Sequence, residues 1–165
     1  MFDAILCEKI MQLANFLISK QLKLGTAESC TGGGLSYALS SIRGSSQWFE
    51  RGLVTYSNDA KMTLLGVKAT TLQQYGAVSQ ETAEEMVNGL LLHHPLDLGI
   101  AITGIAGPDG GSLEKPIGTV WIAWKAKSTD TTCMHFHFNG DRNRIRVSSI
   151  EAAIDQLLIL CDKIA

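Results

Sequence analysis

Charge is scarce in this sequence, and neither sign prevails. Of 165 residues, 14 are Lys or Arg and 16 are Asp or Glu, which gives a formal net charge of −2 at pH 7. Basic and acidic residues are interspersed, whereas a nucleic-acid-binding protein presents a cluster of positive charge. No hydrophobic run approaches the roughly 20 residues that a membrane-spanning helix needs. We therefore expect neither a nucleic acid nor a membrane as partner.

Paired cysteines and a secretory signal are missing as well. The cysteines lie far apart, without paired spacing, at Cys7, Cys30, Cys133 and Cys161. Free thiols are typical of a reducing compartment. The first residues carry an acidic side chain before any basic one, unlike a secretory signal. We therefore expect a cytoplasmic protein.

Apolar residues, in contrast, are plentiful, with 45% of residues hydrophobic against 18% charged. This balance is typical of a chain that buries a core and argues against disorder. The length suits one domain, and the sequence contains no internal repeat or low-complexity linker. We expect residues 1–165 to form a single domain.

Helical and extended patterns alternate along the chain. Apolar spacing and capping residues predict helices over residues 2–21, 35–42, from the cap Asn58 to Gly66, 70–75, from Ser79 to about His93, and after the cap Asp141. Apolar runs predict strands near Leu24 and over residues 48–57, 97–103, 117–127 and 131–138. The alternation predicts an α/β fold, a three-layer α/β/α sandwich with a mixed, mostly parallel sheet whose last two strands are antiparallel neighbours.

The most informative segment is the glycine-rich stretch of residues 26–34, between a predicted strand and a predicted helix. Such a turn directs backbone N–H groups and the positive end of a helix dipole outward. This turn contains two candidate nucleophiles, Ser29 and Cys30. A hydroxyl beside free N–H groups indicates acyl transfer, whereas the same turn without a working nucleophile is an anion-binding site.

Sites in α/β folds gather at the carboxyl ends of the strands. We therefore expect residues 28–33, 56–61 and 103–112 to converge there. The loop of residues 104–112 contains four glycines and one proline. Its N–H groups can approach a phosphate or ribose closely, although a plain surface turn has the same composition.

A histidine base for Ser29 is missing from these converging segments, so a Ser-His-Asp triad is not expected. A lysine can replace histidine where burial leaves its amine neutral. Lys61 is the best-placed lysine, and Tyr56 can orient its amine or pass a proton. N–H groups near Thr31 and Gly32 are candidates for stabilising a tetrahedral oxyanion. On composition alone, a solvated helix position is the commoner environment for a lysine.

The remaining candidates are weaker. Cys30 is either a rival nucleophile or a small buried residue at a helix start. Arg142 is either a fork-shaped ligand for phosphate or a surface arginine. His135 and His137 lie on one strand face, but no third or fourth metal ligand follows at recognisable spacing. The glycines of the turn match neither a P-loop nor a dinucleotide fingerprint. We therefore expect no metal and no cofactor.

The whole chain resembles the CinA C-terminal domain family. The matching motifs are Thr26-Ala-Glu-Ser-Cys-Thr-Gly-Gly33, Gly44-Ser-Ser-Gln-Trp-Phe-Glu-Arg-Gly52, Val54-Thr-Tyr-Ser-Asn58 with Ala60-Lys61, Gly76-Ala-Val-Ser79, Thr103-Gly-Ile-Ala-Gly-Pro-Asp-Gly-Gly-Ser112, Glu114-Lys-Pro-Ile-Gly-Thr-Val-Trp121 and Gly140-Asp-Arg142. The resemblance implies a three-layer α/β/α sandwich and a homo-oligomer. It also implies hydrolysis of nicotinamide mononucleotide to nicotinate mononucleotide and ammonia, in pyridine-nucleotide salvage.

The resemblance further implies residue roles. Ser29 becomes the nucleophile that forms an acyl-enzyme, Lys61 its base, and Tyr56 an assistant. The substrate nucleotide is expected to meet Glu28, Thr31, Gly32, Thr103, Gly107, Ser112 and Arg142. Two alternatives stay open at this point, a non-catalytic module that binds a nucleotide or a partner protein, and a thiol amidase that uses Cys30.

Overall fold

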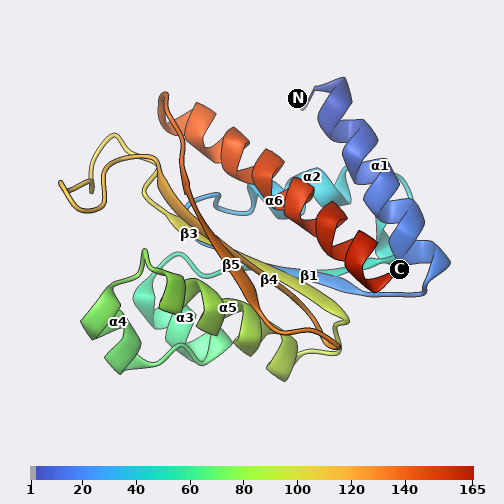
Figure 1. The fold of residues 1–165 in the computed structure, drawn as a ribbon, viewed down its shortest axis with the longest axis horizontal. Helices are drawn as coiled ribbons and strands as arrows, with labels where there is room; N and C mark the ends of the chain where they lie inside the picture. The colour runs from blue at the N-terminus through green and yellow to red at the C-terminus, as the bar shows by residue number, and fades with distance from the viewer. Residues whose placement is uncertain (1–2) are drawn as a thin grey trace.

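The computed structural model describes residues 3–165 and contains one five-stranded sheet with six α-helices (Figure 1). The elements in chain order are α1 (Ala4–Ser19), β1 (Leu24–Glu28), α2 (Gly34–Ser40), a 3-10 turn η1 (Ser45–Gln47), β2 (Phe49–Val54), α3 (Asn58–Leu65), α4 (Ala69–Tyr75), α5 (Gln80–His93), β3 (Leu98–Gly104), β4 (Thr119–Ala126), β5 (Thr132–His137) and α6 (Arg142–Ile164). Each predicted element is present, with ends shifted by a few residues. Residue 2 of the first predicted helix lies outside the described part.

The sheet is mixed, as predicted, with the strand order β2-β1-β3-β4-β5. β1 pairs in parallel with both β2 and β3, whereas β4 runs antiparallel to its neighbours β3 and β5. Four of the five strands therefore point the same way. The carboxyl ends of β1, β2 and β3 meet at one edge of the sheet, where an α/β fold places its site.

Side-chain oxygens fix the beginnings of several helices. Asp3 accepts a hydrogen bond from the Leu6 N–H at 2.8 Å, and Asp141 accepts one from the Arg144 N–H at 2.8 Å. The cap of α3 is Ser57, whose hydroxyl accepts the Ala60 N–H at 3.0 Å. The predicted cap Asn58 was wrong by one position, because either residue type satisfies the exposed N–H groups of a helix start.

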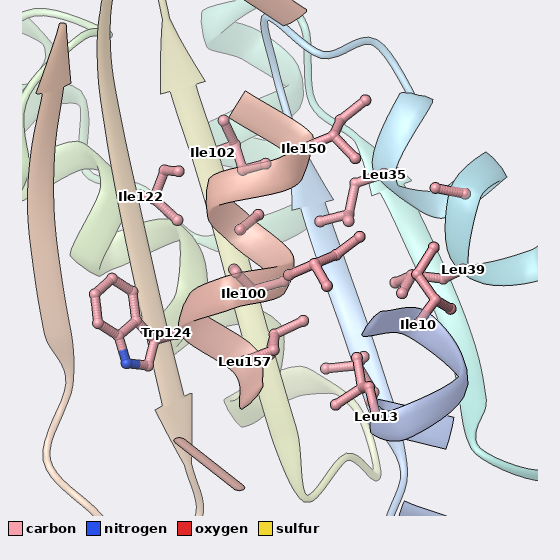
Figure 2. Packing of buried hydrophobic residues seen from close by; sticks show 14 of the residues in the cluster. Ile10, Leu13, Leu35, Leu39, Ile100, Ile102, Ile122, Trp124, Ile150 and Leu157 are labelled. Atoms are coloured by element: carbon pink, nitrogen blue, oxygen red, sulfur yellow. The ribbon is translucent and has the colours of Figure 1, made fainter. Parts of the chain in front are cut away.

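Two helical layers cover the sheet, so the predicted three-layer arrangement is confirmed. Helices α1, α2 and α6 pack on one face and α3, α4 and α5 on the other (Figure 1). Alternating side chains divide each strand between the layers, since Ile100 and Ile102 enter the first core and Ala101 the second. Figure 2 shows the first core, in which the large side chains of β3 and β4 meet those of α1, α2 and α6.

Small residues let the second layer approach the sheet and itself closely. A Cβ atom on Gly99 of β3 would lie 2.8 Å from the Leu91 side chain of α5. A Cβ atom on Gly89 of α5 would lie 1.7 Å from the Leu65 carbonyl oxygen at the end of α3. Both separations are far below van der Waals contact, so α5 can pack this tightly only because these positions lack side chains.

Two further expectations concern the chain as a whole. All four cysteines are free, as predicted from their spacing. In the stretch from residue 3 to residue 165, no helix has both the length and the apolar character needed to cross a membrane.

Candidate active site

The turn after β1 presents Ser29 at the carboxyl edge of the sheet. The Ser29 N–H donates to the Ile102 carbonyl at 2.9 Å, which extends the ladder between β1 and β3 by one residue. The Gly32 N–H donates to the Ser29 carbonyl at 3.0 Å and closes the turn. Gly32 and Gly33 have φ values of 59° and 89°, a left-handed conformation that other residues rarely adopt. The glycines therefore allow the chain to reverse directly behind the serine.

Lys61 lies under this turn, although a lysine at a helix start is usually solvated. Its side chain is only 1% exposed. The Nζ atom donates to Ser29 Oγ at 3.0 Å, to the Thr55 carbonyl at 2.8 Å and to the Tyr56 carbonyl at 3.4 Å. Two of the three predicted segments, the ones that follow β1 and β2, thus meet at one amine, as the strand-end argument predicted.

The surroundings of Lys61 favour its neutral form. Burial lowers the pKa of Lys61, because an ammonium ion loses its hydration there. A neutral amine has two protons and one lone pair. If the carbonyls of Thr55 and Tyr56 accept the two protons, the lone pair is left for the Ser29 hydroxyl. The geometry therefore fits a base that takes a proton from Ser29.

A cavity of about 260 Å³ opens beside this pair. Its walls come from the three predicted segments, from the predicted Arg142 and from two positions that sequence reasoning had given no role, Ala77 and Val78. The lining residues are Ser29, Cys30, Tyr56, Lys61, Ala77, Val78, Thr103, Gly104, Ile105, Ala106, Gly107, Asp109, Gly110 and Arg142. Ala77 and Val78 form the loop between α4 and α5. The Thr103 hydroxyl donates to the Ala77 carbonyl at 2.7 Å and fixes this loop against β3. The signal for this wall was the motif Gly76-Ala-Val-Ser79, which resembles the family. Its two lining residues, Ala77 and Val78, have no reactive side chain.

Arg142 joins two walls of the cavity. Its Nη1 donates to the Gly107 carbonyl at 2.7 Å, and its Nη2 donates to the Tyr56 hydroxyl at 3.1 Å. The Tyr56 side chain is 60% exposed, and its hydroxyl faces Arg142. The contact between Tyr56 and Lys61 is made by the backbone carbonyl of Tyr56, which differs from the expected side-chain role.

Four predicted substrate residues do not line this cavity. Glu28 is fully buried, and its carboxylate accepts hydrogen bonds from the Thr31 hydroxyl at 2.7 Å, the Leu35 N–H at 3.0 Å and the Ser36 N–H and hydroxyl at 2.7 and 2.6 Å. It caps α2 from the preceding strand, because the N-cap Gly33 has no side chain to do so. The buried Thr31 belongs to the same network. Neither side chain can be an outer contact for a nucleotide.

The other two are Gly32 and Ser112. The Gly32 N–H is occupied by the Ser29 carbonyl, so it is not free to bind an oxyanion. The N–H groups of Cys30 and Thr31 take no part in the backbone hydrogen bonds of this turn. Ser112 lies farther along the loop, where its hydroxyl accepts the Lys115 N–H at 3.0 Å beside a second, shallow hollow.

Cys30 does not have the properties of a nucleophile. Its side chain is buried, and burial raises the pKa of the Cys30 thiol to about 12. The thiolate is the reactive form of cysteine. The Cys30 thiol therefore stays protonated at neutral pH.

Metal ligands do not gather at this site or elsewhere in residues 3–165, where no three His, Cys, Asp or Glu side chains are placed to hold an ion. The His135 ring packs against Trp121 instead, with ring centroids 4.9 Å apart.

Fold and site together define an α/β protein with a serine and a buried lysine at the carboxyl ends of its parallel strands. The family model of the CinA C-terminal domain matches residues 8–161, and the chain belongs to this family.

Individual relatives agree with this assignment. A protein of Enterobacter agglomerans named nicotinamide-nucleotide amidohydrolase PncC is 43% identical over 162 residues, which cover 96% of this chain and 99% of the relative. A putative competence-damage inducible protein of Acetivibrio thermocellus is 49% identical over 144 residues, 87% of this chain but only 35% of that longer protein. The crystal structure of the competence/damage inducible protein CihA from Agrobacterium tumefaciens superposes with a TM-score of 0.95 at 40% identity, covering 97% of this chain and 98% of that one.

Proposed function

We propose that this chain is an amidohydrolase that converts nicotinamide mononucleotide and water to nicotinate mononucleotide and ammonia. The observation that carries the proposal is the 3.0 Å hydrogen bond between Lys61 Nζ and Ser29 Oγ at the base of the cavity. The printed name of the Enterobacter agglomerans relative, which matches nearly from end to end, supports a nicotinamide nucleotide as substrate.

In the first half of the reaction, Ser29 Oγ attacks the carboxamide carbon while Lys61 takes the hydroxyl proton. The carbonyl oxygen gains negative charge, for which the N–H groups of Cys30 and Thr31 are the proposed donors, since neither takes part in the backbone–backbone hydrogen bonds of the turn. When the tetrahedral intermediate collapses, the C–N bond breaks and Lys61 returns its proton to the leaving nitrogen. Ammonia departs and an ester remains on Ser29.

In the second half, water attacks the ester carbon and Lys61 takes its proton. The Ser29–acyl bond then breaks, and Lys61 returns the proton to Ser29 Oγ. The product leaves as the acid and gives its remaining proton to the solvent, where ammonia takes it up, so that a carboxylate and an ammonium ion result. Protein groups and water account for every proton in both halves, because a single amine alternates between base and acid.

The walls of the cavity suit the rest of the substrate. Ala77, Val78 and Ala106 provide an apolar surface for a pyridine ring. Arg142 donates one N–H to the Gly107 carbonyl and one to the Tyr56 hydroxyl. The other N–H groups of its guanidinium remain for the phosphate. Thr103 lines the same cavity beside Ala77, and Ser112, at the second hollow, is an outer contact for the nucleotide.

Ammonia release from nicotinamide mononucleotide by the purified chain tests the proposal. The native chain should release ammonia, and Ser29→Ala should abolish release while the far-UV circular dichroism spectrum and melting temperature stay close to native. Binding without turnover by the native chain would favour a non-catalytic nucleotide-binding module. Full turnover by Ser29→Ala would refute the acyl-enzyme.

The setting of this activity is also a proposal. Free cysteines support a reducing cytoplasm, where pyridine-nucleotide salvage would take place. The likeness to the CinA C-terminal domain family supports a homo-oligomer formed by residues 1–165 as one domain. Sedimentation equilibrium at several protein concentrations measures the assembly, and a purely monomeric chain would contradict it.

A further inference from the structure

Helix α6 brings two arginines to the site, four residues apart and therefore on one face of the helix. Arg142, in the first turn, contacts the outer wall of the cavity. Arg146, one turn later, reaches the back of the turn that carries Ser29. Its Nη2 donates to the Thr31 carbonyl oxygen at 2.7 Å. Arg146 does not line the cavity, so the proposed reaction gives it no role.

The surroundings of Arg146 show that the turn and the guanidinium fit one another. A Cβ atom on Gly32 would lie 3.3 Å from Arg146 Nη2, so the bare glycine makes room for the cation. Arg146 Nε is buried and has no hydrogen-bond partner. None of the ion pairs found in residues 3–165 includes Arg146. A half-buried cation without a carboxylate partner thus stands directly behind the nucleophile.

Arg146 and Glu28 hold the turn from two sides. The Glu28 carboxylate accepts the Thr31 hydroxyl, and Arg146 donates to the Thr31 carbonyl. The side chain and the main chain of a single residue, two positions after Ser29, are therefore both fixed. The direction of the Thr31 carbonyl determines the plane of the peptide that joins Thr31 to Gly32, and this peptide donates the hydrogen bond that closes on the Ser29 carbonyl.

We propose that Arg146 is a positioning residue for the amide hydrolysis proposed above, on which this inference rests. Through the Thr31 carbonyl, its guanidinium holds the turn so that the Ser29 hydroxyl faces Lys61 and the next two N–H groups stay free for the oxyanion. Its positive charge, unpaired by any acid, also favours the negative charge that develops in front of the turn. Both effects act in the transition state and leave substrate binding alone.

Variants at position 146 test this inference. Arg146→Gln should lower kcat by at least about tenfold with KM within about twofold of native, because misplacing a nucleophile by even an ångström costs this much or more. Arg146→Lys, which keeps a charge and a donor, should recover most of the loss. Arg146→Ala should regain activity when millimolar guanidinium is added. Arg144→Gln, an exposed arginine on the same helix, is the matched control and should behave as native.

A second readout does not depend on the substrate. A fluorophosphonate probe reacts with an activated serine, and mass spectrometry gives its rate of attachment to Ser29. Arg146→Gln should slow this labelling by the same factor as kcat. A native chain that is labelled but releases no ammonia would refute the proposed substrate, while the labelling rates would still decide the role of Arg146.

Three results would overturn the inference. The first is labelling and turnover in Arg146→Gln within twofold of native. The second is a loss that follows the melting temperature alone, with no recovery in Arg146→Lys and none with guanidinium. The third is a native chain that is neither labelled nor active, since it would have no reactive serine to position. If Arg146→Gln does not fold, the labelling rate and kcat of Arg146→Lys decide the question.

Discussion

Replacing Glu28 by glutamine tests the network that holds the nucleophile turn. In the native chain, Oε1 accepts the N–H and hydroxyl of Ser36, and Oε2 accepts the Leu35 N–H and the Thr31 hydroxyl. An amide keeps one accepting oxygen and puts an NH₂ group in place of the other. The hydroxyls of Ser36 and Thr31 can rotate and accept from it, but a backbone N–H cannot. Either orientation of the amide leaves one N–H of α2 without an acceptor.

The expected cost follows from these contacts. A buried donor without a partner costs about 1 to 3 kcal/mol. Loss of the negative charge at the start of α2 costs about 0.3 to 1 kcal/mol more. Glu28→Gln should therefore lower the free energy of unfolding by about 1.5 to 4 kcal/mol, which corresponds to roughly 4 to 15 °C in melting temperature for a chain of this length.

Urea denaturation followed by circular dichroism measures this difference. Glu8→Gln is the matched control, because it makes the same charge change at an exposed position of α1. Stability of Glu28→Gln within about 0.5 kcal/mol of native, or an increase from relieved burial of the carboxylate, would refute the reasoning. A change confined to KM, with native stability, would return Glu28 to the role of a substrate contact.

Other predictions concern the base, the neighbouring thiol and the packing of α5. The rate of ammonia release should rise with pH through the lowered pKa of Lys61 and then reach a plateau, because only the neutral amine accepts a proton. Lys61→Arg should lose at least roughly 10²-fold in kcat and should not show this rise. Iodoacetamide at pH 7 should leave ammonia release intact, since a pKa of about 12 leaves roughly one Cys30 thiol in 10⁵ ionised; inactivation that Cys30→Ser resists would contradict this. Gly89→Ala should lower the free energy of unfolding, measured in urea. The clash of the new methyl group with the Leu65 carbonyl costs about 1 to 3 kcal/mol, more than the roughly 1 kcal/mol gained in helix propensity. A more stable variant would refute the close α3–α5 contact.

The spacing of apolar residues, together with the cap and turn residues, was sufficient to predict the helices and strands and their layers. The stop at Gly66 and the caps Ser79 and Asp141 lie where the sequence placed them, because caps and turns depend on local chemistry. The convergence of three segments followed from a rule about parallel strands and needed no coordinates.

Side-chain direction could not be predicted in the same way. A lysine is usually solvated, and only the fold shows that the strand ends bury Lys61. Glu28 lies one position before the nucleophile and suggested a substrate contact, but successive side chains of a strand point to opposite faces. Its carboxylate turns towards α2, where an uncapped helix start needs an acceptor. Local pattern therefore identified which residues are polar near the site and left open which of them face the cavity.

Arg146 shows a second limit of local reasoning. It follows Ser29 by more than a hundred residues, and no motif links the two. Their contact exists because α6 crosses the same sheet face as α2, which begins at the nucleophile turn (Figure 1). A helix of 23 residues that is anchored along its length in the first core can present Arg142 and Arg146 with little freedom to move. The rigidity that positions a catalytic turn thus originates in core packing far from the reacting atoms, and variants that loosen α6 should lower kcat before they unfold the chain.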